Sequence, residues 1–159
     1  MRVCLIIPPS PFLLDERVFV QLGILKIASA LEEQNYTVDM IDLSGVENYT
    51  DVLTDYTKRK DRADVFGITA TTPQVPYAVK ISQHIKALLP AKQSKVILGG
   101  PHVTLMHTAA KREAKKNLVG SDRATKDVEA LKSFFDVLVC GDGEIAIFDA
   151  IHEDMKIID

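Results

Sequence analysis

Short apolar runs alternate along the chain with longer stretches in which apolar residues recur every three or four positions. The apolar runs predict buried strands at residues 3–7, 38–43, 64–69, 96–98 and 136–140. The three- and four-residue spacing predicts helices at residues 22–34, 49–56, 73–89, 102–116, 127–135 and 145–152. Residues 117–126 are polar and small, which predicts a surface loop, and residues 155–159 are expected to lead away from the last helix.

This alternation predicts an α/β, Rossmann-like fold of the flavodoxin type. Short strand–helix–strand units require parallel strands joined by right-handed crossovers. Nearly continuous apolar strands are typical of sheets that carry helices on both faces. We therefore expect a doubly wound, five-stranded parallel sheet in the order 2-1-3-4-5, folded as a single domain over residues 1–159. Asp39 and Asp42 interrupt the second strand, which indicates an edge or near-edge position.

Charge and cysteine usage narrow the class of protein. The formal net charge of −3 gives no large basic surplus, so we expect neither a nucleic-acid nor a membrane partner. No apolar run approaches the length of a membrane span. Cys4 and Cys140 both fall in predicted strands and form no C-x-x-C pair. We expect them to be buried thiols in a protein of the reducing cytoplasm.

Ligands of doubly wound sheets bind beyond the carboxyl ends of the strands, near the point where the strand order reverses. The loops at these ends are residues 8–16, 69–74, 99–104 and 141–144. They lack the acidic residues of a phosphoacceptor receiver, the phosphate loop of a flavodoxin and the G-x-G-x-x-G of a dinucleotide site. They also present no nucleophile with a base, so we assign no catalytic residue and no metal ligand.

Hydroxyl groups and bare backbone remain at these loops. Thr69, Thr71 and Thr72 follow the third strand, and their hydroxyls suit ribose, phosphate or amide groups. Gly99 and Gly100 end the fourth strand and leave space for a bulky polar ligand beside a helix N-terminus. Their joint placement favours a large ligand that carries amide groups.

The loop after the first strand carries three consecutive apolar residues, Phe12, Leu13 and Leu14. They either pack onto their own sheet, form a lid over a flat ligand, or form a docking surface for another domain.

Three loop segments carry a family resemblance: Pro8-Pro9-Ser10-Pro11, Leu98-Gly99-Gly100-Pro101-His102 and Cys140-Gly141-Asp142-Gly143-Glu144. In this order and spacing they resemble the N-terminal cobalamin (B12)-binding domain of B12-dependent radical SAM proteins. The resemblance implies that the lower face of a corrin ring rests on the strand-end loops, and that the nucleotide tail threads between sheet and helices. The cofactor-binding positions that it implies are Pro9, Ser10, Thr69, Thr71, Thr72, Gly99, Gly100, His102, Gly141, Asp142, Gly143 and Glu144.

The resemblance also sets expectations for the cobalt ligand. Related methionine-synthase-like domains place a D-x-H-x-x-G motif after the first strand, whereas residues 8–16 contain no histidine. We therefore expect base-off cobalamin with no histidine ligand from that loop. His102 is either a substitute axial ligand or a helix-start residue that bonds backbone or solvent. Asp142 and Glu144 either bond a corrin amide, contact a following domain, or cap the last helix.

The catalytic half of the family binds S-adenosylmethionine and a 4Fe–4S cluster through a C-x-x-x-C-x-x-C motif, which this chain lacks. We therefore expect a non-catalytic domain of a longer chain, with a C-terminal radical SAM domain that is a methyltransferase in many members. Two alternatives stay open. One is a Rossmann-like interaction or scaffold domain that has lost cofactor binding, and the other is a different small-molecule enzyme on this fold.

Overall fold

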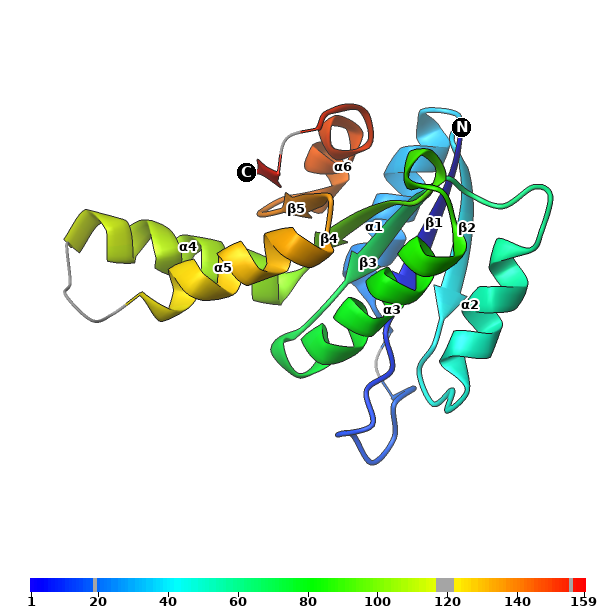
Figure 1. Ribbon diagram of the computed structural model, residues 1–159, viewed down its shortest axis with the longest axis horizontal. Coiled ribbons are helices and arrows are strands. Elements are labelled where there is room, and N and C mark those ends of the chain that lie inside the picture. The colour runs from blue at the N-terminus through cyan, green and yellow to red at the C-terminus, as the bar shows by residue number, and fades with distance from the viewer. Residues whose placement is uncertain (19, 117–121, 155) are drawn as a thin grey trace.

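The computed structural model describes residues 1–18, 20–116, 122–154 and 156–159. Within these residues, six parallel strands form one sheet in the order β2-β1-β3-β4-β5-β6, with helices on both faces (Figure 1). The strands are β1 Arg2–Ile7, β2 Thr37–Asp42, β3 Val65–Thr69, β4 Lys95–Gly99, β5 Val137–Val139 and β6 Ile157–Ile158. The helices are α1 Leu22–Glu33, α2 Tyr49–Thr57, α3 Val75–Leu88, α4 Pro101–Lys116, α5 Arg123–Phe134 and α6 Gly143–His152, with 3-10 turns η1 Thr72–Gln74 and η2 Ala91–Gln93. No helix among the described residues is both long and apolar enough to cross a membrane.

The predicted Rossmann-like fold and strand order are confirmed, but the prediction of five strands is wrong, because the described residues contain a sixth. β6 pairs in parallel with β5: Leu138 N–H donates to the carbonyl of Lys156 (2.9 Å), and Cys140 N–H donates to that of Ile158 (2.8 Å). A strand of two residues has no readable period, which is why residues 155–159 predicted only an exit from the last helix. β2 pairs with β1 alone in the described sheet, so the predicted edge position is confirmed.

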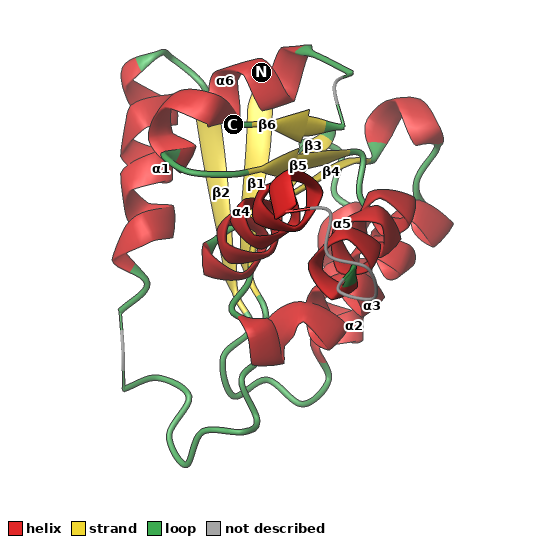
Figure 2. Cartoon of the chain, turned by 90° about the vertical axis from the view of Figure 1, so that its left-hand side faces the viewer, coloured by secondary structure: helices red, strands yellow, loops and turns green. Residues whose placement is uncertain are grey.

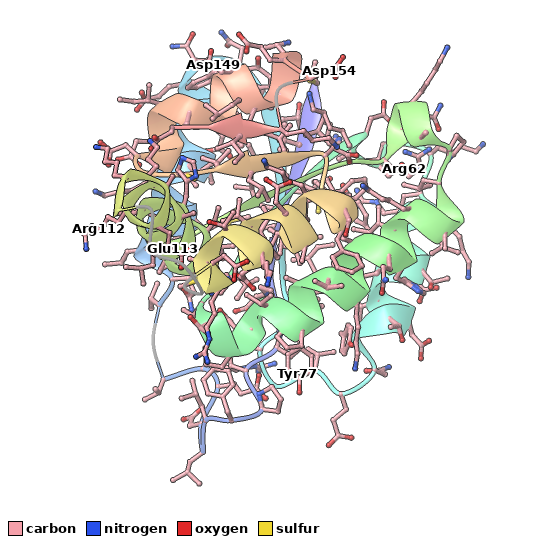
Figure 3. The ribbon with its side chains drawn as sticks, turned by 60° about the vertical axis from the view of Figure 1, so that its left-hand side comes forward. Arg62, Tyr77, Arg112, Glu113, Asp149 and Asp154 are labelled. Carbon is pink, nitrogen blue, oxygen red and sulfur yellow. The ribbon has the colours of Figure 1, made fainter. Side chains whose placement is uncertain are left out.

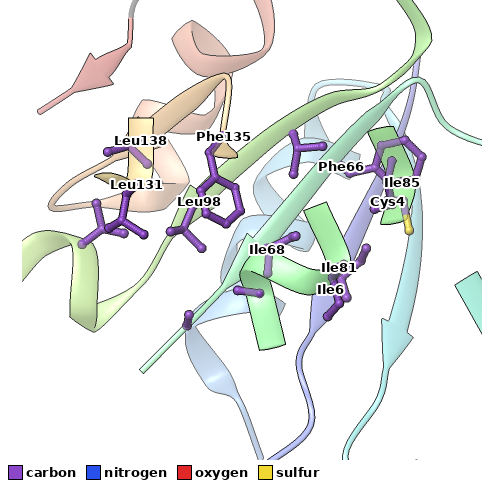
Figure 4. Packing of buried hydrophobic residues seen from close by; sticks show 14 of the residues in the cluster. Cys4, Ile6, Phe66, Ile68, Ile81, Ile85, Leu98, Leu131, Phe135 and Leu138 are labelled. Carbon is purple, nitrogen blue, oxygen red and sulfur yellow. The ribbon is translucent and has the colours of Figure 1, made fainter. Parts of the chain in front are cut away.

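The two faces of the sheet carry different helices. α2, α3 and α5 lie on one face, and α1 and α6 lie on the other (Figure 2). Side chains alternate between the faces along each strand. On the first face, Phe66 and Ile68 of β3 pack with Ile81 and Ile85 of α3 (Figure 4). Gly67, which lies between Phe66 and Ile68 in β3, therefore faces α1 and α6.

α4 and α5 lie side by side and project beyond the sheet (Figure 1). Glu113 of α4 lies next to the start of α5 (Figure 3), where it accepts hydrogen bonds from the backbone N–H of Ala124 (3.1 Å) and Thr125 (3.0 Å). These bonds hold the pKa of Glu113 below its usual range, and the bond from the Thr125 N–H contributes most to this lowering. The capped helix begins at Arg123, so the prediction of a loop over residues 117–126 is wrong for its last residues. Residues 117–121 lie outside the described part.

Candidate functional site

A cavity of about 280 Å³ lies between the sheet and the layer formed by α1 and α6. Strands β1, β3, β4 and β5 form its floor, and it extends to the loops at their carboxyl ends. Its interior is mostly apolar, with side chains from Leu5, Ile24, Ile27, Ile97, Val139 and Ile147. A cavity of this kind accepts a flat or apolar uncharged group.

Gly67 opens the floor of this cavity. It lies in the middle of β3, where the strands on both sides present apolar side chains. A Cβ built at Gly67 would lie 2.9 Å from Cδ2 of Leu5, too close for two unmoved carbon atoms. A glycine inside a buried strand weakens packing unless another group comes close to the backbone. The missing side chain therefore leaves room beside the central strand.

Gly143 and Gly100 bring backbone close to the cavity rim. A Cβ at Gly143 would lie 2.9 Å from Cδ1 of Ile27, so glycine lets the start of α6 approach α1. Gly100 has a φ of +102°, and a Cβ there would lie 2.8 Å from Thr69 Oγ1. Only glycine fits at position 100 without moving the loop after β3.

Polar groups gather at the cavity mouth. Thr69 contributes a hydroxyl at the end of β3, and Asp142 and Glu144 contribute carboxylates at the start of α6. Thr104 Oγ1 donates to the carbonyl of Gly100 (3.2 Å) and accepts the N–H of Gly141 (3.2 Å), which ties the loop after β4 to the loop after β5. The mouth is therefore a polar rim around an apolar interior.

The structure brings seven of the twelve predicted cofactor-binding residues together around this cavity, within the described part of the chain. These are Thr69, Gly99, Gly100, Gly141, Asp142, Gly143 and Glu144. Pro9 lines a different, more open hollow beside Tyr49 and Tyr77. The remaining four, Ser10, Thr71, Thr72 and His102, do not line this cavity and lie in hydrogen-bond networks of their own.

His102 is buried and has a partner on each ring nitrogen. Nδ1 lies 3.1 Å from Thr72 Oγ1, and Nε2 lies 2.9 Å from a carboxylate oxygen of Asp127. The backbone N–H of His102 also donates to the carbonyl of Ala70 (3.2 Å). The ring therefore connects η1, α4 and α5, and its orientation is fixed by the protein.

Cys140 follows β5 directly and is buried. Burial, and secondarily the negative charge of Asp159, raises the pKa of the Cys140 thiol to about 11. The thiol is therefore protonated at neutral pH, a state that makes a poor metal ligand or nucleophile. Across the described ranges, no three His, Cys, Asp or Glu side chains gather as a metal site.

The apolar loop after β1 does not pack onto its own sheet. Phe12 is half exposed, Leu13 is 37% exposed and Leu14 is fully exposed. The first of the three readings of this loop is therefore wrong, which leaves a lid or a docking surface.

The sequence patterns did not identify most of the residues that line the cavity interior. Leu5, Ile24, Ile27, Ile97 and Ile147 look like any other core residues in a strand or helix pattern. Gly67 did give a signal, because a lone glycine inside an apolar strand indicates a close backbone approach.

A doubly wound parallel sheet with an apolar cavity at the carboxyl ends of its strands defines a Rossmann-like ligand-binding domain. A family model described as the B12 binding domain matches residues 16–125, which is more than half of the chain. The chain therefore belongs to the B12-binding domain family, and the resemblance to cobalamin-binding domains is confirmed. Membership implies that the ligand is a corrinoid.

Two solved structures are similar to the chain. The radical S-adenosylmethionine methyltransferase TsrM from Kitasatospora setae, solved with tryptophan and a SAM analogue, has a TM-score of 0.52 and 18% identity, covering 65% of this chain and 20% of that one. A cobalamin-binding protein from Desulfitobacterium hafniense DCB-2 has a TM-score of 0.46 and 15% identity, covering 62% of this chain and 44% of that one. At 18% identity the likeness to TsrM concerns the fold alone, and the chain spans a fifth of its length. No curated protein matches the sequence.

The residues present fit a corrinoid with a nucleotide tail. The glycine at position 67 leaves space on the sheet that a side chain would fill, and the surrounding cavity is apolar. The hydroxyl of Thr69 stands at the entrance, where it can bond a ring nitrogen or a sugar. A flat aromatic base held on a polar ribose phosphate matches this combination.

Proposed function

We propose that the chain binds cobalamin in the base-off form, with the nucleotide tail in the cavity between the sheet and helices α1 and α6. The observation that carries the proposal is the cavity opened by Gly67, which extends to the loops at the carboxyl ends of the strands. The corrin ring then lies over those loops. When bound, the corrinoid supplies a cobalt centre able to carry a methyl group, and the protein supplies binding and shielding.

The proposal gives separate roles to the residues around the cavity. Thr69 bonds the nucleotide, while Gly99 and Gly100 let the tail pass close to the backbone. Gly141 and Gly143 leave the other side of the entrance free of side chains. Asp142 and Glu144 have carboxylates that accept hydrogen bonds from the corrin amides.

The lower face of the cobalt receives no imidazole from this chain. Residues 8–16 contain no histidine. His102 is buried, and both of its ring nitrogens already have partners in Thr72 and Asp127. The aromatic base of the nucleotide tail is a benzimidazole. If the cavity holds this base, it would not bind the cobalt, which is what base-off means.

We further propose that the bound corrinoid serves a radical SAM domain, which holds the 4Fe–4S cluster and S-adenosylmethionine and completes a methyltransferase. The fold likeness to the radical SAM methyltransferase TsrM, of which this chain spans a fifth, supports this link. The exposed side chains of Phe12 and Leu14 are available to contact such a domain.

A scaffold domain without cofactor is the second candidate, and the same exposed loop favours it. Under this alternative, residues 12–14 serve docking only. Phe12→Asp would then abolish association with the partner domain, while no variant would affect corrinoid uptake.

Gel filtration with hydroxocobalamin tests the proposal. The 159-residue chain, mixed with excess hydroxocobalamin, should elute as a red complex whose visible spectrum is that of base-off cobalamin. Flavin mononucleotide, the ligand of flavodoxins with this type of fold, should not co-elute. A colourless protein peak would overturn the proposal in favour of the scaffold, and a base-on spectrum would overturn the placement of the tail.

A further inference from the structure

Gln74 is a buried polar residue of the 3-10 turn η1. Only 2% of its surface is exposed, although it lies beside the loops at the carboxyl edge of the sheet. Its Nε2 donates to the carbonyl of Pro8 (3.2 Å) and to Ser10 Oγ (2.8 Å). Its Oε1 accepts the N–H and the hydroxyl of Thr71, both at 3.0 Å. Every polar group of the side-chain amide therefore has a partner.

These bonds join two loops that the backbone leaves separate. Pro8 and Ser10 follow β1 and Thr71 follows β3, and these neighbouring strands flank the point where the strand order reverses. Among the described residues, no backbone hydrogen bond connects the loop over residues 8–16 with that over residues 69–74. The next pair of loops is different, because Ala70 N–H donates directly to the carbonyl of Gly99 (3.1 Å).

Among the described residues, side-chain hydrogen bonds anchor the loop after β1 near its base and, through Arg17 Nε and the carbonyl of Ser44 (3.1 Å), near its end. Besides Gln74, the carboxylate of Glu16 accepts the N–H of Ser10. Phe12 and Leu14, beyond this anchor, are exposed. Beyond the paired ends of β1 and β3, the amide of Gln74 thus links Ser10 to Thr71.

We propose that Gln74 is a positioning residue that holds these two loops at the separation needed to support the corrin ring. The inference rests on the proposed function, because it concerns the same site. Gln74 touches no ligand itself and acts through Ser10 and Thr71, whose hydroxyls face the amide rather than the cavity. It makes part of the corrin-binding surface rigid before the ligand arrives, which lowers the ordering cost of binding.

Gln74→Met tests this role, because methionine keeps a similar shape and removes every hydrogen bond of the amide. We expect cobalamin binding to weaken about tenfold or more, the effect of losing one or two net hydrogen bonds that hold the loops. Ser82→Ala is the matched control. Ser82 is also fully buried on the α3 side of the sheet, and its Oγ donates to the carbonyl of Phe134 (2.7 Å), away from the carboxyl-edge loops. This control should lower Tm but change Kd by less than about twofold.

Hydroxocobalamin titrations and thermal melts of the three proteins separate the outcomes. If wild type binds and Gln74→Met binds equally well, the inference is overturned and the proposed function stands. If both variants lose affinity in proportion to their loss of Tm, Gln74 is merely structural and the inference is overturned. If wild type itself does not bind, the proposed function fails.

Two milder variants keep the test decisive should Gln74→Met not fold. Ser10→Ala and Thr71→Val each remove one hydroxyl partner of Gln74 and leave the rest of the network in place. Each should weaken binding, and the double variant should weaken it by less than the product of the two single effects, because both act through Gln74. Unchanged affinity in both single variants would overturn the inference.

Discussion

Replacing Gly67 by valine should remove cobalamin binding without unfolding the protein. A Cβ at this position would lie 2.9 Å from Cδ2 of Leu5, so the Leu5 side chain must turn and the added methyl groups enter the cavity. Valine adds three carbon atoms at the floor of the 280 Å³ cavity. They take up the space beside β3 in which we place the flat base of the tail.

The loss of affinity follows from the surface that the base can no longer bury. A benzimidazole is similar in size to the ring of an aromatic side chain, and such groups bury about 150 Å² or more. At about 25 cal/mol per Å² this burial is worth about 4 kcal/mol, as an upper estimate. We therefore expect Gly67→Val to raise the Kd for cobalamin by about 100-fold, within the limit of about 1,000-fold that 4 kcal/mol sets. Tm should change little, because the flexible end of Leu5 can turn aside and valine suits a strand.

Titrations with cobalamin and with cobinamide, which lacks the nucleotide tail, check this reasoning. Wild type should bind cobalamin much more tightly than cobinamide, whereas Gly67→Val should bind both with the same weak affinity. Gly67→Ala should fall between them, since only the flexible end of Leu5 has to move. An unchanged preference for cobalamin in a well-folded Gly67→Val protein would refute the placement of the tail in this cavity.

Three further predictions concern Glu113, His102 and Cys140. Glu113→Gln should lower Tm at neutral pH. The N–H groups of α5 depress the pKa of the wild-type carboxylate, so this carboxylate stabilises the fold until the pH falls through that pKa. The Tm difference between wild type and variant should therefore vanish in strongly acidic buffer. His102→Leu should cost about 1–3 kcal/mol in urea denaturation, since it leaves Asp127 and Thr72 without their partner, and the spectrum of bound cobalamin should stay base-off. The Cys140 thiol, with a pKa raised to about 11, should react with iodoacetamide at pH 7.5 far more slowly than free cysteine does, and fast alkylation of the folded protein would contradict its burial.

Local patterns in the sequence were enough to predict most of the fold. Apolar runs and helical periodicity are set by neighbouring residues, so the order of five strands followed from them. β6 was not predicted, because its two residues are stabilised by pairing with β5, a contact that no local pattern records. The start of α5 was not predicted, because the side chain that caps it, Glu113, comes from a different helix.

The rim of the site was easier to predict than its interior. Gly99, Gly100 and residues 141–144 form short motifs, and the topology places such loops at one edge of the sheet. The cavity itself depends on how α1 and α6 lie over Gly67, which the sequence does not record. Gln74 looks like an ordinary polar residue near a helix start, and only the folded chain shows that its amide joins two loops.

A crystal structure of the chain with bound cobalamin tests the central claim most directly. Our account predicts the benzimidazole between the sheet and helices α1 and α6, in contact with the backbone of Gly67, and the corrin ring over the loops after β1, β3, β4 and β5. A complex with the tail outside this cavity, or with the benzimidazole still bonded to cobalt, would contradict it.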